Sequence, residues 1–168
     1  MPKIIENLPE RLLEETHHQL QTVGYSGLTV RSVAKACGVG VGTVYNYFPS
    51  KEALLATYLL ADWNERIAAI QAVSSRSSSP EPVAHCIYDQ LRSFAGAHAA
   101  IFQSPDAAGA FAGAFSRYHG LLRSQIAAPL RKFCSDDFTA DVLAESLLTW
   151  TMSGKPFHEI YGVIRKLF

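Results

Sequence analysis

Residues 28–52 read LTVRSVAKACGVGVGTVYNYFPSKE, and this stretch decides the fold of the N-terminal part of the chain. Thr29 is a residue type favoured as a helix N-cap, and apolar residues follow it at the spacing of one helix face. Gly38 interrupts that pattern, because glycine readily adopts the positive φ at which helices end. A second helix is predicted over residues 41–47, and Pro49 ends it. Two short helices joined by a tight turn predict a helix-turn-helix, whose second helix enters the DNA major groove.

The flanking sequence predicts a helix on each side of this motif. Residues 7–23 carry apolar side chains at helical spacing, which gives a first helix with one buried face. A longer helix is predicted from residue 51 to about residue 73, with Ser50 as its N-cap. The chain therefore begins with a predicted three-helix DNA-binding domain over residues 1–52.

The remainder of the chain, residues 53–168, also has the pattern of helices. A segment rich in small residues, SSRSSSP at 74–80, predicts a linker within it. No alternating strand pattern and no internal repeat occurs, so the predicted fold class is all-α, with a helix-turn-helix head and a helical-bundle body. Further helices are predicted over residues 81–103, 107–133, 138–153 and 156–167.

Charge and hydropathy restrict how such a chain binds a partner. The 168 residues have a formal net charge of +0, and residues 1–52 contain five basic and five acidic residues. DNA binding by a neutral head depends on hydroxyl groups, helix N-termini and a few well-placed cations, which predicts a modest dependence on salt. Charged residues make up only 18% of the chain, so part of its surface is expected to be apolar and covered by a partner.

Several functional classes receive no support from the sequence. Cys37, Cys86 and Cys134 have no metal-ligand spacing, and no two histidines have the H-x3-H spacing of a metal site, so no metal and no cofactor are expected. The N-terminus does not read as a signal peptide, and no apolar run approaches the ~20 residues of a membrane span. These features predict a cytoplasmic location without a membrane partner. No nucleophile–base arrangement, paired-carboxylate motif or phosphate-binding loop indicates an enzyme.

The head resembles the DNA-binding head of the tetracycline-repressor (TetR) family of bacterial regulators. The resemblance covers about residues 8–60, and its string around the recognition helix is far longer than a general helix-turn-helix pattern. Position 40 departs from the family, which usually has serine there; Gly40 lacks the side-chain cap. The matching residues are Gly24-Tyr25, Leu28-Thr29-Val30, Val33-Ala34, Gly38-Val39, Gly42-Thr43-Val44-Tyr45, Tyr47-Phe48 and Ser50-Lys51-Glu52-Ala53-Leu54-Leu55.

This resemblance implies a set of DNA-contacting residues. The hydroxyl groups of Thr43 and Tyr47 are expected at phosphates, with Tyr45 and Asn46 at base edges, and Lys51 is expected at a phosphate. Two alternatives stay open: Tyr45 packs in the core, and Arg31 is a solvated charge without a DNA contact. The full expected set is Thr29, Arg31, Val41, Gly42, Thr43, Tyr45, Asn46, Tyr47 and Lys51.

The resemblance also implies that the body binds a small effector. Phe111, Phe115 and Tyr118 recur at helical spacing, and alanine and glycine between them leave space beside the rings. The same stripe is equally the pattern of an ordinary hydrophobic core, and this alternative stays open. The residues expected to line a site for a small hydrophobic effector are Tyr88, Phe94, His98, Phe102, Phe111, Phe115, Tyr118, His119 and Trp150.

Residues 138–168 are too apolar for a solvated chain end and predict a homodimer surface, which the family builds from two helices of each subunit. The alternative is that they cover the body's own core. The predicted function is that of a homodimeric, ligand-responsive repressor, released from a palindromic operator in double-stranded DNA by its effector. The alternative function is that of a ligand-independent DNA-binding regulator or architectural factor.

Overall fold

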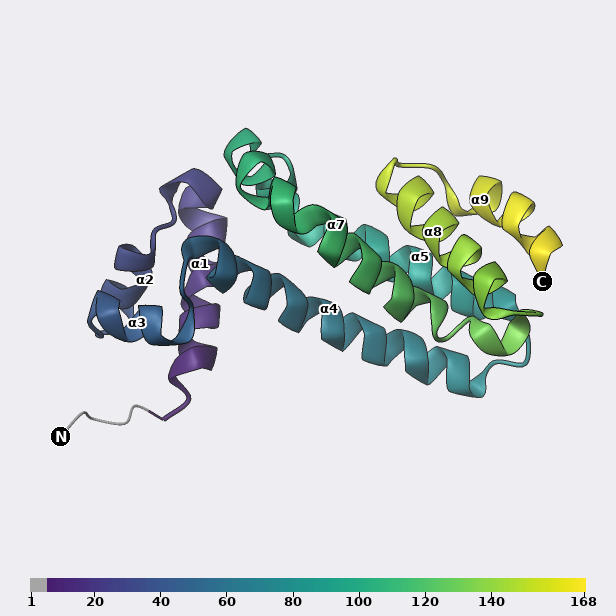
Figure 1. Cartoon of the computed structure of the whole chain (residues 1–168), viewed down its shortest axis with the longest axis horizontal. Helices are drawn as coiled ribbons and strands as arrows, with labels where there is room; N and C mark the ends of the chain where they lie inside the picture. Colours follow the sequence, from purple (N-terminus) through teal and green to yellow (C-terminus); the bar gives the residue numbers. More distant parts are fainter. Residues whose placement is uncertain (1–5) are drawn as a thin grey trace. The chain divides into compact units, whose positions relative to one another are not determined.

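The computed structural model describes residues 6–168, with the side chains of residue 108 and of residues 110–117 outside the described part. Every regular element in this range is a helix (Figure 1), which confirms the predicted all-α fold. Among the described residues, no helix is both long and apolar enough to cross a bilayer. The α-helices are α1 (Leu8–Gly27), α2 (Val30–Ala36), α3 (Val41–Tyr47), α4 (Lys51–Arg76), α5 (Pro80–Ala97), α6 (Ala99–Phe102), α7 (Pro105–Ala127), α8 (Asp137–Met152) and α9 (Phe157–Ile164). Two 3-10 turns, η1 (Arg131–Phe133) and η2 (Arg165–Leu167), follow α7 and α9.

The chain forms two compact units. The first, here called the head unit, contains the chain up to residue 62 together with residues 99–112. The second, here called the body unit, contains residues 63–98 and 113–168. Because α4 and α7 each contribute to both units, the division is not a simple cut between consecutive segments. The functional boundary predicted after residue 52 stays a prediction.

The head unit is held together by one hydrophobic core. Side chains from α1, α2, α3 and the first turns of α4 are fully buried in it, including Leu12, Val44 and Leu54. Ile101 of α6 and Ala107 of α7 belong to the same core, although they lie far along the chain. The α6–α7 corner therefore completes the hydrophobic core on which the helix-turn-helix rests.

The linker predicted at residues 74–80 is shortened to residues 77–79, because α4 continues to Arg76 and α5 begins at Pro80. Lys132 explains the extension: its ammonium group donates to the carbonyl oxygens of Ser74 and Ser77. The hydroxyl group of Ser74 donates in turn to the carbonyl oxygen of Pro129 at 2.9 Å. Carbonyl groups at a helix end lack intrahelical partners, so these contacts stabilise the last turn of α4. The break before α5 is therefore shorter than predicted.

The body unit is a bundle in which α5 packs against α8 and α9 (Figure 1). Trp63 is buried in it, donates from Nε1 to Gln125 Oε1 at 2.9 Å, and meets the ring of Phe94 edge-on at 5.4 Å. The ring of Phe157 lies 4.4 Å from that of His85 and fixes the start of α9 against α5. The helix predicted over residues 81–103 is divided at His98.

Ile101→Ala is expected to lower the free energy of unfolding by about 2–5 kcal/mol, because it leaves a cavity in the core of the head unit. Val23→Ala is the matched control, since Val23 on α1 is 55% exposed, and its effect should stay within about 0.5 kcal/mol. Urea denaturation followed by circular dichroism measures both. Equal effects of the two substitutions would contradict the placement of Ile101 in this core.

Candidate nucleic-acid interface

The N-terminus of α2 is fixed by side chains, as the sequence predicted. Thr29 Oγ1 accepts from the backbone N–H of Ser32 at 3.0 Å, and Ser32 Oγ accepts from the backbone N–H of Thr29 at 3.2 Å. This reciprocal capping box satisfies two donors that a helix start leaves unpaired. Ser32 Oγ also donates to Gln19 Oε1 at 2.6 Å, which ties α2 to α1. The hydroxyl oxygen of Thr29 is therefore already engaged in the cap.

The turn between α2 and α3 depends on glycine. Gly38 has φ +70°, in the left-handed region that residues with a Cβ rarely adopt. The backbone N–H of Val39 donates to the carbonyl oxygen of Ala34 at 2.9 Å and closes the end of α2. Gly40 occupies the N-cap of α3 without a side-chain hydrogen bond, as its lack of a side chain requires. The turn therefore has the geometry that the sequence predicted.

The helix α3 has a buried face and an exposed face. Val44 and Phe48 are buried in the core of the head unit, which holds α3 in place. Tyr45 and Tyr47 are 49% and 50% exposed, and Asn46 is exposed between them. Tyr45 is therefore not a core residue, and the alternative that placed it there is ruled out. The outer face of α3 offers two phenol groups and an amide as hydrogen-bonding groups.

Gly42 and its neighbours leave the start of α3 open. A Cβ added at Gly42 would meet no atom within 4 Å, so no protein group covers this position. Val41 and Thr43 are half-buried on either side of it. A second backbone, such as that of a nucleic acid, can therefore approach the helix closely here.

The cations of the motif lie in different surroundings. Arg31 and Lys35 are exposed on α2. Lys51, at the start of α4, instead donates from Nζ to the carbonyl oxygen of Tyr25 at 2.6 Å and lies 3.9 Å from the centroid of the Tyr25 ring. Partial burial lowers the pKa of Lys51, against the fields of Glu52 and Asp106, which raise it. Nothing in the sequence pattern pointed to this contact between α1 and α4.

The residues predicted to line an effector site differ in how far they are buried. Tyr88, Phe94 and His98 are buried, Phe102 is exposed, and Tyr118 and His119 are half-buried. The side chains of Phe111 and Phe115 lie outside the described residues. The effector site therefore stays a prediction.

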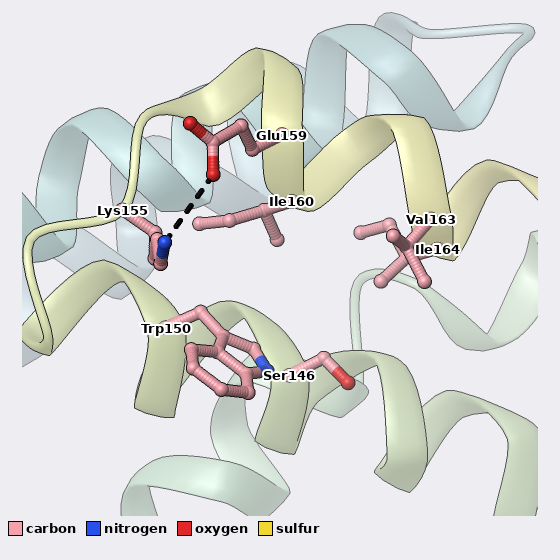
Figure 2. Close-up of a pocket in the computed structure, with 7 residues that line it drawn as sticks. All are labelled: Ser146, Trp150, Lys155, Glu159, Ile160, Val163 and Ile164. Atoms are coloured by element: carbon pink, nitrogen blue, oxygen red, sulfur yellow. Dashed lines mark hydrogen bonds and ion pairs between the residues drawn. The ribbon is translucent and has the colours of Figure 1, made fainter.

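Trp150, the remaining residue of that predicted set, lies at the surface of the body unit. Figure 2 shows it on α8, facing Ile160 and Val163 of α9 across a hollow of about 280 Å³. Lys155 and Glu159 form an ion pair of 3.5 Å at the rim of this hollow. The surface of α8 and α9 therefore combines an exposed indole with an apolar depression.

A hydrogen-bonded contact that the sequence did not reveal joins α7 and α8. His119 Nε2 lies 2.9 Å from both carboxylate oxygens of Glu145. Thr149 Oγ1 donates to Glu145 Oε1 at 2.8 Å. Although burial raises the pKa of Glu145, the hydrogen bonds from His119 and Thr149 outweigh it and hold that pKa below its usual value. The partners lie far apart along the chain, so no local spacing signals the pair.

Together these helices define a helix-turn-helix DNA-binding head attached to a helical body. Residues 12–58 match the family described as "Bacterial regulatory proteins, tetR family". This match covers the helix-turn-helix head of the chain.

A relative among characterised proteins is the HTH-type transcriptional repressor KstR of Rhodococcus jostii (strain RHA1). It is 34% identical over 71 residues, which cover 42% of this chain and 30% of the relative. The matching part of the chain spans about a quarter to a third of the relatives, between 25% and 30% of their length. The sequence relationship is therefore concentrated in the DNA-binding head.

Solved structures extend the likeness of the fold to nearly the whole chain. SCO7518 from Streptomyces coelicolor A3(2) has a TM-score of 0.70 at 17% identity, covering 94% of this chain and 96% of that one. FadR of Thermus thermophilus, a repressor solved in complex with lauroyl-CoA, has a TM-score of 0.64 at 22% identity and covers 95% and 92% of the two chains. At these identities the comparison shows a shared fold.

Gly38→Ala is expected to destabilise the protein by about 1–2 kcal/mol, because alanine is strained at φ +70°. Gly42→Ala is the matched control: Gly42 lies within α3 and has open space around it, so alanine should be neutral or stabilising by up to about 1 kcal/mol. Thermal unfolding of both variants without DNA measures the difference. Equal destabilisation would contradict the role assigned to the turn.

Proposed function

We propose that this chain is a DNA-binding transcriptional repressor that acts as a homodimer and responds to a small hydrophobic effector. The observation that carries the proposal is the exposed face of α3, where Tyr45, Asn46 and Tyr47 project from a helix fixed by buried Val44 and Phe48. This arrangement occurs inside the segment that matches the tetR family. A cytoplasmic location is part of the proposal, because such a regulator acts on DNA.

On DNA, phosphate contacts and base contacts are proposed to come from different residues of α3. The hydroxyl groups of Thr43 and Tyr47 are proposed to bind phosphates, which fixes the position of the helix without reading sequence. Asn46 and Tyr45 are proposed to reach base edges in the major groove, where an amide pairs well with adenine. Val41 and Gly42 would lie close to the groove, with Arg31 and the Thr29 region supporting them from α2.

The proposed dimer surface is the outer side of α8 and α9. Leu143, Leu147 and Ile164 are buried within the subunit, so part of the predicted apolar segment covers the body's own core. Phe138, Trp150 and Val163 project outward and are 78%, 50% and 67% exposed. Trp150 and Val163 line the same hollow between α8 and α9, and exposed large apolar groups favour a partner with the same surface, as two-fold symmetry requires. Two heads related in this way suit an inverted repeat with half-sites about 34–36 Å apart.

The proposed effector is a small hydrophobic molecule. The repressor FadR of Thermus thermophilus, which shares the fold, was solved in complex with lauroyl-CoA, and this supports the proposal of a ligand with an acyl chain. The buried aromatic residues Tyr88 and Phe94 of α5 suit an apolar ligand of that kind. The second candidate function is that of a ligand-independent regulator, which applies if the aromatic residues form a closed core.

Selection of binding sequences from random duplexes tests the DNA-binding function. The wild type should enrich an inverted repeat, and Asn46→Ala should change the enriched bases, because the amide reads base edges. Tyr47→Phe should weaken binding to all duplexes about equally, since a phosphate contact carries no sequence information. Enrichment of no motif by the folded wild type would overturn the proposal.

Substitutions of exposed residues test the dimer without disturbing the core of the subunit. Trp150→Asp and Val163→Asp should each shift a dimer towards monomer in analytical ultracentrifugation, because a charge at an apolar interface loses its hydration. Val23→Asp, at a valine of the head unit that is 55% exposed, should leave the mass unchanged. A wild type that sediments as a folded monomer at micromolar concentration would contradict the dimer.

A further inference from the structure

The ammonium group of Lys51 is engaged inside the protein. It donates to the carbonyl oxygen of Tyr25 at 2.6 Å and lies 3.9 Å from the centroid of the Tyr25 ring. A hydrogen bond from a charged donor is stronger than a neutral one, and a cation above an aromatic face adds further attraction. Two interactions therefore join the first residue of α4 to a single residue in the last turn of α1.

The carbonyl group of Tyr25 belongs to a helix end that requires external partners. α1 departs from helical geometry at Gly24, where φ is 69° and ψ is −176°, and the last turn closes by a bond from Leu28 N–H to the carbonyl oxygen of Gly24. Carbonyl groups in a last turn lack intrahelical donors, and a lysine side chain is a favoured substitute. Lys51 supplies this donor from a different helix.

The surroundings of this contact oppose a move of Lys51 towards solvent. The side chain of Tyr25 is buried in the core of the head unit. Asp106, at the start of α7, accepts from Ser26 Oγ at 2.8 Å, and its field acts on both Tyr25 and Lys51. A phosphate group that recruited this ammonium group would have to replace the Tyr25 carbonyl, the Tyr25 ring and the field of a nearby carboxylate.

We propose that Lys51 is a positioning residue, which ties the start of α4 to the last turn of α1 and thereby fixes the C-terminal end of the recognition helix. The connection is short, because α3 ends at Tyr47 and only Phe48–Ser50 separate it from Lys51. The exposed cations of α2, among them Arg31, then neutralise phosphates on this surface. This inference replaces the phosphate contact that the sequence predicted for Lys51. The part of this inference that concerns DNA binding rests on the proposed function.

Thermal stability without DNA tests the structural half. Lys51→Met keeps the length of the side chain and removes the ammonium group, so the melting temperature should fall by about 3–12 °C, the shift for the loss of one charged hydrogen bond in a chain of this size. Lys35→Met, at an exposed lysine of α2, is the control and should shift it by less than about 1 °C. An unchanged melting temperature for Lys51→Met would overturn the inference. If Lys51→Met does not fold, Lys51→Gln, which removes the positive charge, takes its place: a lowered melting temperature supports the inference, and an unchanged one overturns it.

The salt dependence of DNA binding distinguishes positioning from phosphate contact. On a fluorescein-labelled random-sequence duplex, each lost phosphate contact lowers the slope of log K against log salt by about 0.9. Arg31→Gln should show that loss. Lys51→Met should instead bind more weakly, by about tenfold, with an unchanged slope, and Lys51→Arg should recover most of the affinity, because a guanidinium group also donates to a carbonyl oxygen and stacks on a ring.

The DNA measurement can overturn the inference in two ways. A slope lowered by about 0.9 in Lys51→Met would assign it a phosphate contact and overturn the inference, whatever the melting temperature does. Unchanged affinity in Lys51→Met would also overturn it. If the folded wild type binds no duplex, the proposed function fails, and the melting temperatures of the Lys51→Met and Lys35→Met variants alone decide whether Lys51 positions α4.

Discussion

A helix of seven residues cannot persist alone in water, because so few hydrogen bonds do not offset the entropy lost on ordering the chain. α3 is therefore stabilised by the burial of Val44 and Phe48 in the core of the head unit. The positions of these two side chains in the core also set the orientation of the helix. The exposed face follows from the same constraint: once those two residues point inward, Tyr45 and Asn46 must point outward. The proposed recognition surface is thus a consequence of packing on the opposite side of one short helix.

The parts of the fold that could be predicted are those determined by residues close together in the chain. The cap at Thr29, the left-handed turn at Gly38 and the bounds of α3 depend on at most a few neighbouring residues, and the structure has all three as predicted. The exposure of Tyr45 was left open, because helical spacing alone does not say how wide the buried face is.

The contacts that could not be predicted join residues distant in sequence. No pattern near Lys51 indicates Tyr25 as its partner, and the pairing of His119 with Glu145 depends on how α7 and α8 pack. α4 extends beyond its predicted end for the same reason, since the donor to the carbonyl oxygens at that end is Lys132, from another part of the chain. Such contacts are fixed by tertiary packing. A single sequence predicts the fold class, but it does not predict which distant residues come into contact.

The presence of Ile101 and Ala107 in the core of the head unit has a consequence for how the protein is made. A DNA-binding head encoded by a continuous N-terminal segment would acquire its native core as soon as α4 left the ribosome. Here that core stays incomplete until α5 has been synthesised and α6 returns to α1, which requires closure of a long loop between segments distant in the chain. The emerging head would meanwhile expose apolar surface, the condition under which nascent chains associate with chaperones. Synthesis of the body and maturation of the head are therefore coupled in time.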